Sequence, residues 1–135
     1  MVAYGALVVA YRITARGREF LLVKNTRSKR WSFPAGHVDE GEEHSVAALR
    51  ELQEETTLKR EDLVEFKNTG QWNVFYDDEC VQVRQKVFVA LVNSEAHVQA
   101  GDMIDEFKWV AEADVPKVLT ELSLRELYAK IKSTL

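Results

Sequence analysis

The chain has 135 residues, 46% of them hydrophobic and 30% charged, and a formal net charge of −4 at pH 7. This length and composition suffice to bury a hydrophobic core, so we expect one domain over residues 1–135. The acidic balance argues against general nucleic-acid binding, because a nucleic-acid-binding surface is basic.

Two strands are expected first, over residues 3–14 and 19–25, with Gly17 at the turn between them. The apolar run at residues 1–10 is too short to span a bilayer and lacks a basic leader. It therefore predicts a buried strand and no membrane association.

The loop after the second strand is rich in cations, with Lys24, Arg27, Lys29 and Arg30 close together. Such a loop could bind an anionic ligand. Lys and Arg are mostly exposed in any protein, so a solvated loop explains them equally well. A short extended stretch is then predicted at residues 31–33.

Residues 36–58, GHVDEGEEHSVAALRELQEETTL, are the most informative part of the chain. From about Ser45 to Thr56 the segment consists mainly of good helix formers and contains no Gly or Pro, which predicts a helix. Three glutamates, Glu51, Glu54 and Glu55, are spaced so that they share one face of this helix.

Three carboxylates on one helical face repel each other, and a bound cation would relieve this repulsion. Mg2+ is the natural candidate, with Mn2+ as a substitute, because it prefers oxygen ligands and is often held by carboxylates together with phosphates. Acidic runs on helices are more often simply solvated. The fixed offsets from the glutamates to Gly36, Glu42 and Arg50 favour a metal site instead.

These offsets resemble the signature of the Nudix hydrolases, G-x5-E-x7-R-E-[ILV]-x-E-E-x-G-[ILV]. Every specified position matches except one, where Thr57 replaces a glycine. The preceding residues 31–36 are similar to the usual lead-in of the family. The resemblance implies hydrolysis of nucleoside diphosphates linked to another moiety. It also implies an α/β fold, an α/β/α sandwich with a mixed central sheet, in which the signature forms a loop, a helix and a second loop.

The resemblance also implies roles for individual residues. Glu51, Glu54 and Glu55 would bind the metal, Glu42 would be an auxiliary acid, and Arg50 would orient the cluster. Either Glu51 or Glu54 would be the general base. Gly36 would allow a close approach of backbone and ligand.

Two further expectations concern Thr57 and an acidic ligand from outside the signature. Thr57 is β-branched, and such residues disfavour positive φ, so we expect the helix to run on or to end differently while metal binding is kept. A further acidic ligand often comes from outside the signature in this family. Glu106 and Glu79 are the candidates, and an ordinary surface acid is the alternative for each.

In the C-terminal half, two strands are expected over residues 63–76 and 80–92, with residues 77–79 as the hairpin tip. Cys80 would lie in the second strand. As the single cysteine it excludes an intrachain disulfide and favours a reducing, cytoplasmic location. A last strand is predicted at residues 107–110 and a helix over residues 115–131.

Several side chains could contact a substrate. Arg84 and Lys86 share a strand face, and Trp72 and Tyr76 offer rings on which a base could stack, although such residues are often just solvated or part of the core. The remaining candidates are the loop cations and two further rings: Arg27, Lys29, Arg30, Trp31 and Phe75. Residues 71–92 loosely resemble the hairpin of Nudix enzymes that act on diadenosine polyphosphates.

The sequence thus predicts a Mg2+-dependent pyrophosphohydrolase in which water attacks phosphorus. A dinucleoside polyphosphate is the favoured small-molecule substrate, ahead of nucleoside triphosphates, including oxidised ones, and of ADP-ribose. The main alternative is a Nudix-like binding module without turnover, supported only by Thr57. His37, His44 and His97 lack metal-ligand spacing, and His44 is expected to be exposed. The oligomeric state stays open, a homodimer included.

Overall fold

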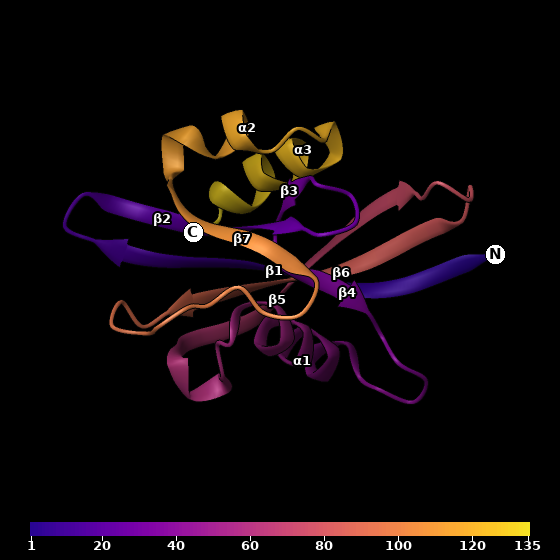
Figure 1. Ribbon diagram of the computed structural model, residues 1–135, viewed down its shortest axis with the longest axis horizontal. Helices are drawn as coiled ribbons and strands as arrows, with labels where there is room; N and C mark the ends of the chain where they lie inside the picture. The colour runs from indigo at the N-terminus through magenta and orange to yellow at the C-terminus, as the bar shows by residue number, and fades with distance from the viewer.

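The computed structural model describes residues 1–135 and forms a mixed sheet with helices on both faces (Figure 1). The strands are β1 (Val2–Thr14), β2 (Gly17–Asn25), β3 (Trp31–Ser32), β4 (Ala35–His37), β5 (Leu63–Tyr76), β6 (Gln82–Val92) and β7 (Ile104–Ala111). The helices are α1 (His44–Thr56), α2 (Val115–Val118) and α3 (Leu122–Lys132), with 3-10 turns η1 (Arg60–Asp62) and η2 (Glu112–Asp114). The expected α/β/α sandwich is confirmed. No helix combines the length and the apolar composition that crossing a bilayer requires.

The sheet follows the order β3-β2-β1-β6-β5, while β4 pairs with β1 and β7 pairs with β2. Only β1 and β6 run parallel; the other pairs are antiparallel. Side chains alternate between the two faces of β1, so Ala6 and Val8 pack under α1 whereas Leu7 and Val9 pack under α2 and α3. Two hydrophobic cores therefore hold one set of helices on each face.

The expected strand pairs β1–β2 and β5–β6 are confirmed, but three expected boundaries are wrong. The last strand starts at Ile104 because β7 pairs along β2 as far as Asn25. The C-terminal helix is split, because Leu119 is extended and its carbonyl accepts a hydrogen bond from the Arg125 guanidinium at 2.7 Å.

Cys80 is an exposed residue of the hairpin turn, with φ of 61°, and does not belong to a strand. The Asp77 carboxylate accepts hydrogen bonds from the N–H groups of Glu79 and Val81, both at 2.9 Å. This local turn extends the hairpin tip through Cys80, so that β6 begins only at Gln82.

Helix α1 ends at Thr56, and Thr57 adopts the left-handed conformation with φ of 65° and ψ of 3°. The expectation that Thr57 would change this helix end is wrong. The Thr57 N–H donates to the Gln53 carbonyl at 2.9 Å, and the following Leu58 is fully buried. Burial of Leu58 requires the turn, so Thr57 takes a conformation that normally favours glycine.

Thr57→Gly should therefore stabilise the protein by about 0.5–1 kcal/mol. The left-handed conformation costs an L-residue roughly 1–2 kcal/mol, and the greater freedom of glycine in the unfolded chain takes back about 0.5–1 kcal/mol. Urea titration measures the difference. Thr57→Ala, which keeps a Cβ, should gain less than Thr57→Gly. A loss of stability in Thr57→Gly would contradict the claim that the left-handed backbone at Thr57 is strained.

Candidate active site

The acidic face of α1 forms as predicted, but its three carboxylates lie in different environments. Glu55 is buried with 9% exposure, the Glu51 side chain is half-buried, and the Glu54 side chain is 45% exposed. Glu54 is therefore the acid that solvent or a ligand reaches most easily.

Arg50 lies among these acids and contacts each of them except Glu55. Its guanidinium donates two hydrogen bonds to the Glu42 carboxylate, at 2.9 and 3.0 Å, and one to Glu51 at 2.8 Å. The contacts with Glu54 are longer, at 3.3 and 3.4 Å. The Arg50 hydrogen bonds hold the pKa of Glu42 at about 2, with help from the Asp39 N–H. Arg50 thus contacts the acids that the signature places beside it, and its orienting role stays a prediction.

Strand β4 brings Gly36 against the Glu51 carboxyl. A Cβ on Gly36 would lie 2.1 Å from the Glu51 Cδ, a distance that no real structure tolerates. The neighbouring Ala35 N–H donates to the Glu55 carboxylate at 3.2 Å. The sequence did not predict β4, yet β4 positions two of the three glutamates.

The loop before β7 binds the last turn of α1 and was missed as a site element. The N–H groups of Gly101 and Asp102 donate to the carbonyls of Glu55 and Glu54, at 2.9 and 2.8 Å. A Cβ on Gly101 would lie 2.0 Å from the Glu54 carbonyl oxygen, so only glycine allows this approach. The lone glycine in this polar loop was the available signal. Asp102 thereby joins the acids near the cluster.

Burial raises the pKa of Glu55 to about 8, against the lowering effect of the Ala35 N–H, and Glu51, Glu54 and Asp102 raise it further. Burial also raises the pKa of Glu51, opposed by Arg50. Without a bound cation, the carboxylates of this cluster therefore carry more negative charge than Arg50 neutralises.

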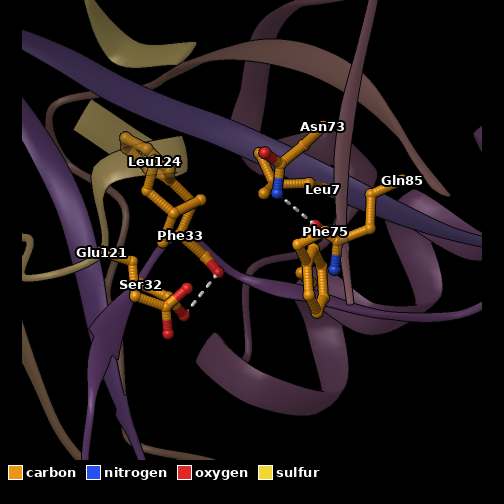
Figure 2. Close-up of a pocket in the computed structure, with 9 residues that line it drawn as sticks. Leu7, Ser32, Phe33, Asn73, Phe75, Gln85, Glu121 and Leu124 are labelled. Atoms are coloured by element: carbon orange, nitrogen blue, oxygen red, sulfur yellow. Dashed lines mark hydrogen bonds between the residues drawn. The ribbon is translucent and has the colours of Figure 1, made fainter. Parts of the chain in front are cut away.

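A cavity of about 140 Å³ lies on the α3 side of the sheet (Figure 2). Figure 2 shows Phe75 and Gln85 on one side of it, with Ser32 and Glu121 across from them. The buried Asn73 amide donates to the Gln85 side-chain oxygen at 3.0 Å. The lining residues are Leu7, Ser32, Phe33, Ala35, Asn73, Phe75, Gln85, Glu121 and Leu124.

A second cavity, of about 230 Å³, adjoins this pocket and extends toward β4. Phe75 and Gln85 line both cavities, and the second one also reaches Gly36 and His37. His37 offers its carbonyl oxygen to Arg50 at 2.9 Å. We call these two adjoining cavities the groove. No residue of α1 lines the groove, but it ends at Gly36 and His37, which lie against Glu51 and Arg50.

Four of the expected substrate contacts lie on the other face of the sheet. Strand alternation turns Trp72, Tyr76, Arg84 and Lys86 away from the face that carries Asn73, Phe75 and Gln85, which together line the cavity. The Trp72 ring instead packs against His44 at the start of α1, with ring centroids 5.7 Å apart. His44 is half-buried there, so its expected exposure is wrong.

The loop cations are largely paired. Lys29 binds Asp105 at 2.7 Å, and Arg30 binds Glu121 at 3.2 Å at the edge of the first cavity. Arg27 forms no ion pair. Among the expected outer acids, Glu106 faces Lys24 at 3.6 Å, and Glu79 lies at the exposed hairpin tip.

The family model of the NUDIX domain matches residues 3–131. The chain belongs to the Nudix family. A bis(5'-nucleosyl)-tetraphosphatase [asymmetrical] from Caenorhabditis elegans is 30% identical over 100% of this chain and 98% of its own. A crystal structure of a C. elegans Ap4A hydrolase binary complex superimposes with a TM-score of 0.87 and 26% identity, covering 98% of this chain and 96% of that one. An RNA pyrophosphohydrolase from Aeromonas hydrophila is 30% identical over 73% of this chain and 66% of its own.

Nudix hydrolases generally use a divalent metal. In the chain by itself no three acidic, histidine or cysteine side chains converge closely enough to hold an ion, because Arg50 lies between Glu51 and Glu54. The donors are nevertheless carboxylate oxygens, which hard divalent ions prefer, and the buried Glu55 lacks a cationic partner. The chemistry of this Nudix helix therefore suits such an ion.

The buried Glu55 predicts how stability depends on pH in metal-free protein. Its pKa in the folded chain, about 8, lies above the ordinary value of 4.5. Its favourable contribution is therefore complete below pH 4.5 and is lost as the pH rises through about 8. In EDTA, Glu55→Gln should be more stable than the wild type by several kcal/mol at pH 9, since each pKa unit corresponds to about 1.4 kcal/mol, and by much less at pH 4.

Chemical denaturation over this pH range, with and without Mg2+, measures the effect. Added metal should raise the stability of the wild type by mass action and should not raise that of Glu55→Gln. Glu40→Gln, at an exposed loop position, is the control and should follow the wild type. A wild-type curve parallel to that of Glu55→Gln in EDTA would contradict the prediction.

Proposed function

We propose that this Nudix hydrolase is Mg2+-dependent and cleaves a phosphoanhydride bond of a dinucleoside polyphosphate by attack of water on phosphorus. The observation that carries the proposal is the groove that leads from the cavity at Phe75 to Gly36 and His37, next to the carboxylate cluster. A base in the cavity and a phosphate chain along the groove would place an anhydride bond at the acids. The full-length similarity to an asymmetrical tetraphosphatase supports this substrate.

In this proposal Glu51, Glu54 and Glu55 hold Mg2+, with Mn2+ as a substitute and Asp102 as an additional acid. When bound, the ion neutralises phosphate charge and lowers the pKa of a bound water. Glu54 is our candidate for the general base, because it is exposed and its contacts with Arg50 are long enough to be exchanged for a water. Most of the rate then comes from positioning and electrostatics.

The first cavity would take the nucleobase. The Phe75 ring provides a flat surface, and bases stack on aromatic rings with about 1–3 kcal/mol per base. Asn73 uses an N–H to bind Gln85, so its carbonyl oxygen and the Gln85 amide nitrogen are left for polar contacts with a base. Arg27, which has no ion pair, and Arg30, held by Glu121, are the cations available for phosphates.

A substrate panel tests the proposal. Each charge-assisted phosphate contact contributes about 1.5–3 kcal/mol, so a dinucleoside tetraphosphate should have a higher kcat/KM than ADP-ribose. Phe75→Ala should raise KM more than it lowers kcat. Trp72→Ala, on the opposite face, should change neither parameter by more than about 2-fold, which corresponds to about 0.4 kcal/mol. Equal or better activity on ADP-ribose would contradict the proposal of a dinucleoside polyphosphate substrate.

A nucleoside triphosphate, oxidised or not, is the second candidate substrate, because it also carries a base and a phosphate chain. The same panel separates it by the products, pyrophosphate from a triphosphate against two nucleotides from a tetraphosphate. The alternative of a binding module loses its support, because Thr57 ends α1 in the same conformation as a glycine would. We further propose a cytoplasmic location, which the free, exposed Cys80 favours.

A further inference from the structure

A second surface lies on the face of the sheet that α1 only partly covers. Near the start of β1 and along the β5–β6 hairpin, four large apolar side chains are exposed: Tyr4 (48%), Trp72 (43%), Val74 (44%) and Tyr76 (67%). Strand pairing places Arg84 between Tyr4 and Val74 and places Lys86 opposite Trp72. We call these six residues the open face. In Figure 1 this end of β1 and the hairpin extend beyond the helices at the right.

The open face is unusual for its position in the sheet. Tyr4, Arg84 and Lys86 lie on the parallel pair β1–β6, and parallel strands are normally covered on both faces. The other three residues lie on the neighbouring antiparallel strand β5. Further along the same face, α1 covers Val8 and Ala10 completely. Clustered aromatic side chains without a cover mark interaction surfaces.

The charges around the open face are unpaired and complementary. Arg84 and Lys86 form no ion pair; Arg84 donates to the Gln82 side chain, and the Lys86 ammonium lies 5.7 Å from the Trp72 ring centroid. Asp78 and Glu79, at the adjoining hairpin tip, form no ion pair either. One surface therefore carries two free cations beside two free acids.

We propose that the open face is the contact between two copies of this chain in a two-fold homodimer. In an isologous contact the same patch meets itself, so each group must find its complement elsewhere in the patch. If the two sheets meet with their strands reversed, the acidic tip of each copy lies over the cations of the other. The exposed rings then cover each other at the centre, as in other protein interfaces.

The area fits a reversible dimer. Taking about 200 Å² for a fully exposed aromatic side chain, the four apolar residues offer roughly 400 Å² per copy. Two copies would bury roughly 800 Å² of this surface, and the charged rim would bring the total to about 1,200 Å², the lower end for specific interfaces. A dissociation constant in the micromolar range is therefore expected.

The dimer would leave the two cavities at Phe75 and Gln85 free, because they open on the other face of the sheet. Each copy would work independently. The proposal therefore stands apart from the proposed substrate, and the two can fail separately.

Sedimentation velocity from about 1 µM to about 1 mM tests the dimer, since interfaces of this size often dissociate in that range. The wild type should shift from monomer to dimer, and Val74→Lys should raise the dissociation constant at least about 10-fold. Val64→Lys is the matched control: the same change at an exposed position of the same strand, away from the open face, should leave it unchanged.

A charge exchange provides the second arm. Arg84→Glu should weaken the dimer, because it faces the acidic tip of the other copy with a like charge, and Arg84→Glu combined with Glu79→Arg should restore it at least in part. A wild-type chain that stays monomeric over the whole concentration range overturns the proposal. A dimer that survives both Val74→Lys and Arg84→Glu also overturns it.

Discussion

Replacing Glu54 by glutamine should lower kcat by about 100-fold or more, the usual contribution of a general base. Gln keeps the size of the side chain and its place on α1 but cannot accept a proton. Glu54 is the most exposed acid of the cluster and is held only by long contacts with Arg50, at 3.3 and 3.4 Å, so its loss should disturb the fold little. Single-turnover rates at saturating Mg2+ measure the chemical step.

Turnover in 18O-water adds a mechanistic test. Attack by water should place one label in one product phosphate, whereas a trapped phosphoenzyme would contradict the mechanism. Glu126→Gln, an acid on α3 outside the first cavity, should keep wild-type kcat. If Glu51→Gln abolishes turnover and Glu54→Gln does not, the role of base moves to Glu51.

Gly36→Ala should lower kcat on the order of 100-fold without unfolding the protein. The added methyl group would lie 2.1 Å from the Glu51 Cδ, so the carboxylate must move. A displacement of about 1 Å at a catalytic group can cost this much in rate. Steady-state kinetics, together with thermal melts, separate the loss of rate from a loss of stability.

Gly41→Ala controls for the loss of a glycine as such. Gly41 has φ of 77°, and a Cβ there would meet no atom within 4 Å. The substitution should cost about 1–2 kcal/mol of stability through backbone strain and leave kcat near the wild-type value. Wild-type kcat in Gly36→Ala would show that the position of Glu51 does not limit the reaction.

Part of the candidate site could be predicted because it depends on contacts within one helix. The offsets of three and four residues put Glu51, Glu54 and Glu55 on one face of α1 whatever surrounds it. Arg50 reaches its acids on the same helix and in the loop just before it, and its orienting role was expected from the resemblance to the family signature. The prediction for Thr57 was wrong because it used only the backbone preference of a single residue. The left-handed conformation of Thr57 accompanies burial of Leu58, which is a tertiary contact.

The sequence by itself therefore determined the family, the order of the strands and helices apart from β4 and the break between α2 and α3, and the shared acidic face, because these depend on periodicity and short-range spacing. Only the tertiary structure decided which strand residues line the groove. The β5–β6 register puts Phe75 in the groove and Trp72 on the open face, and a shift of one residue would exchange them. Likewise, β4 and the loop at Gly101 meet α1 through contacts between distant segments, which no local pattern encodes.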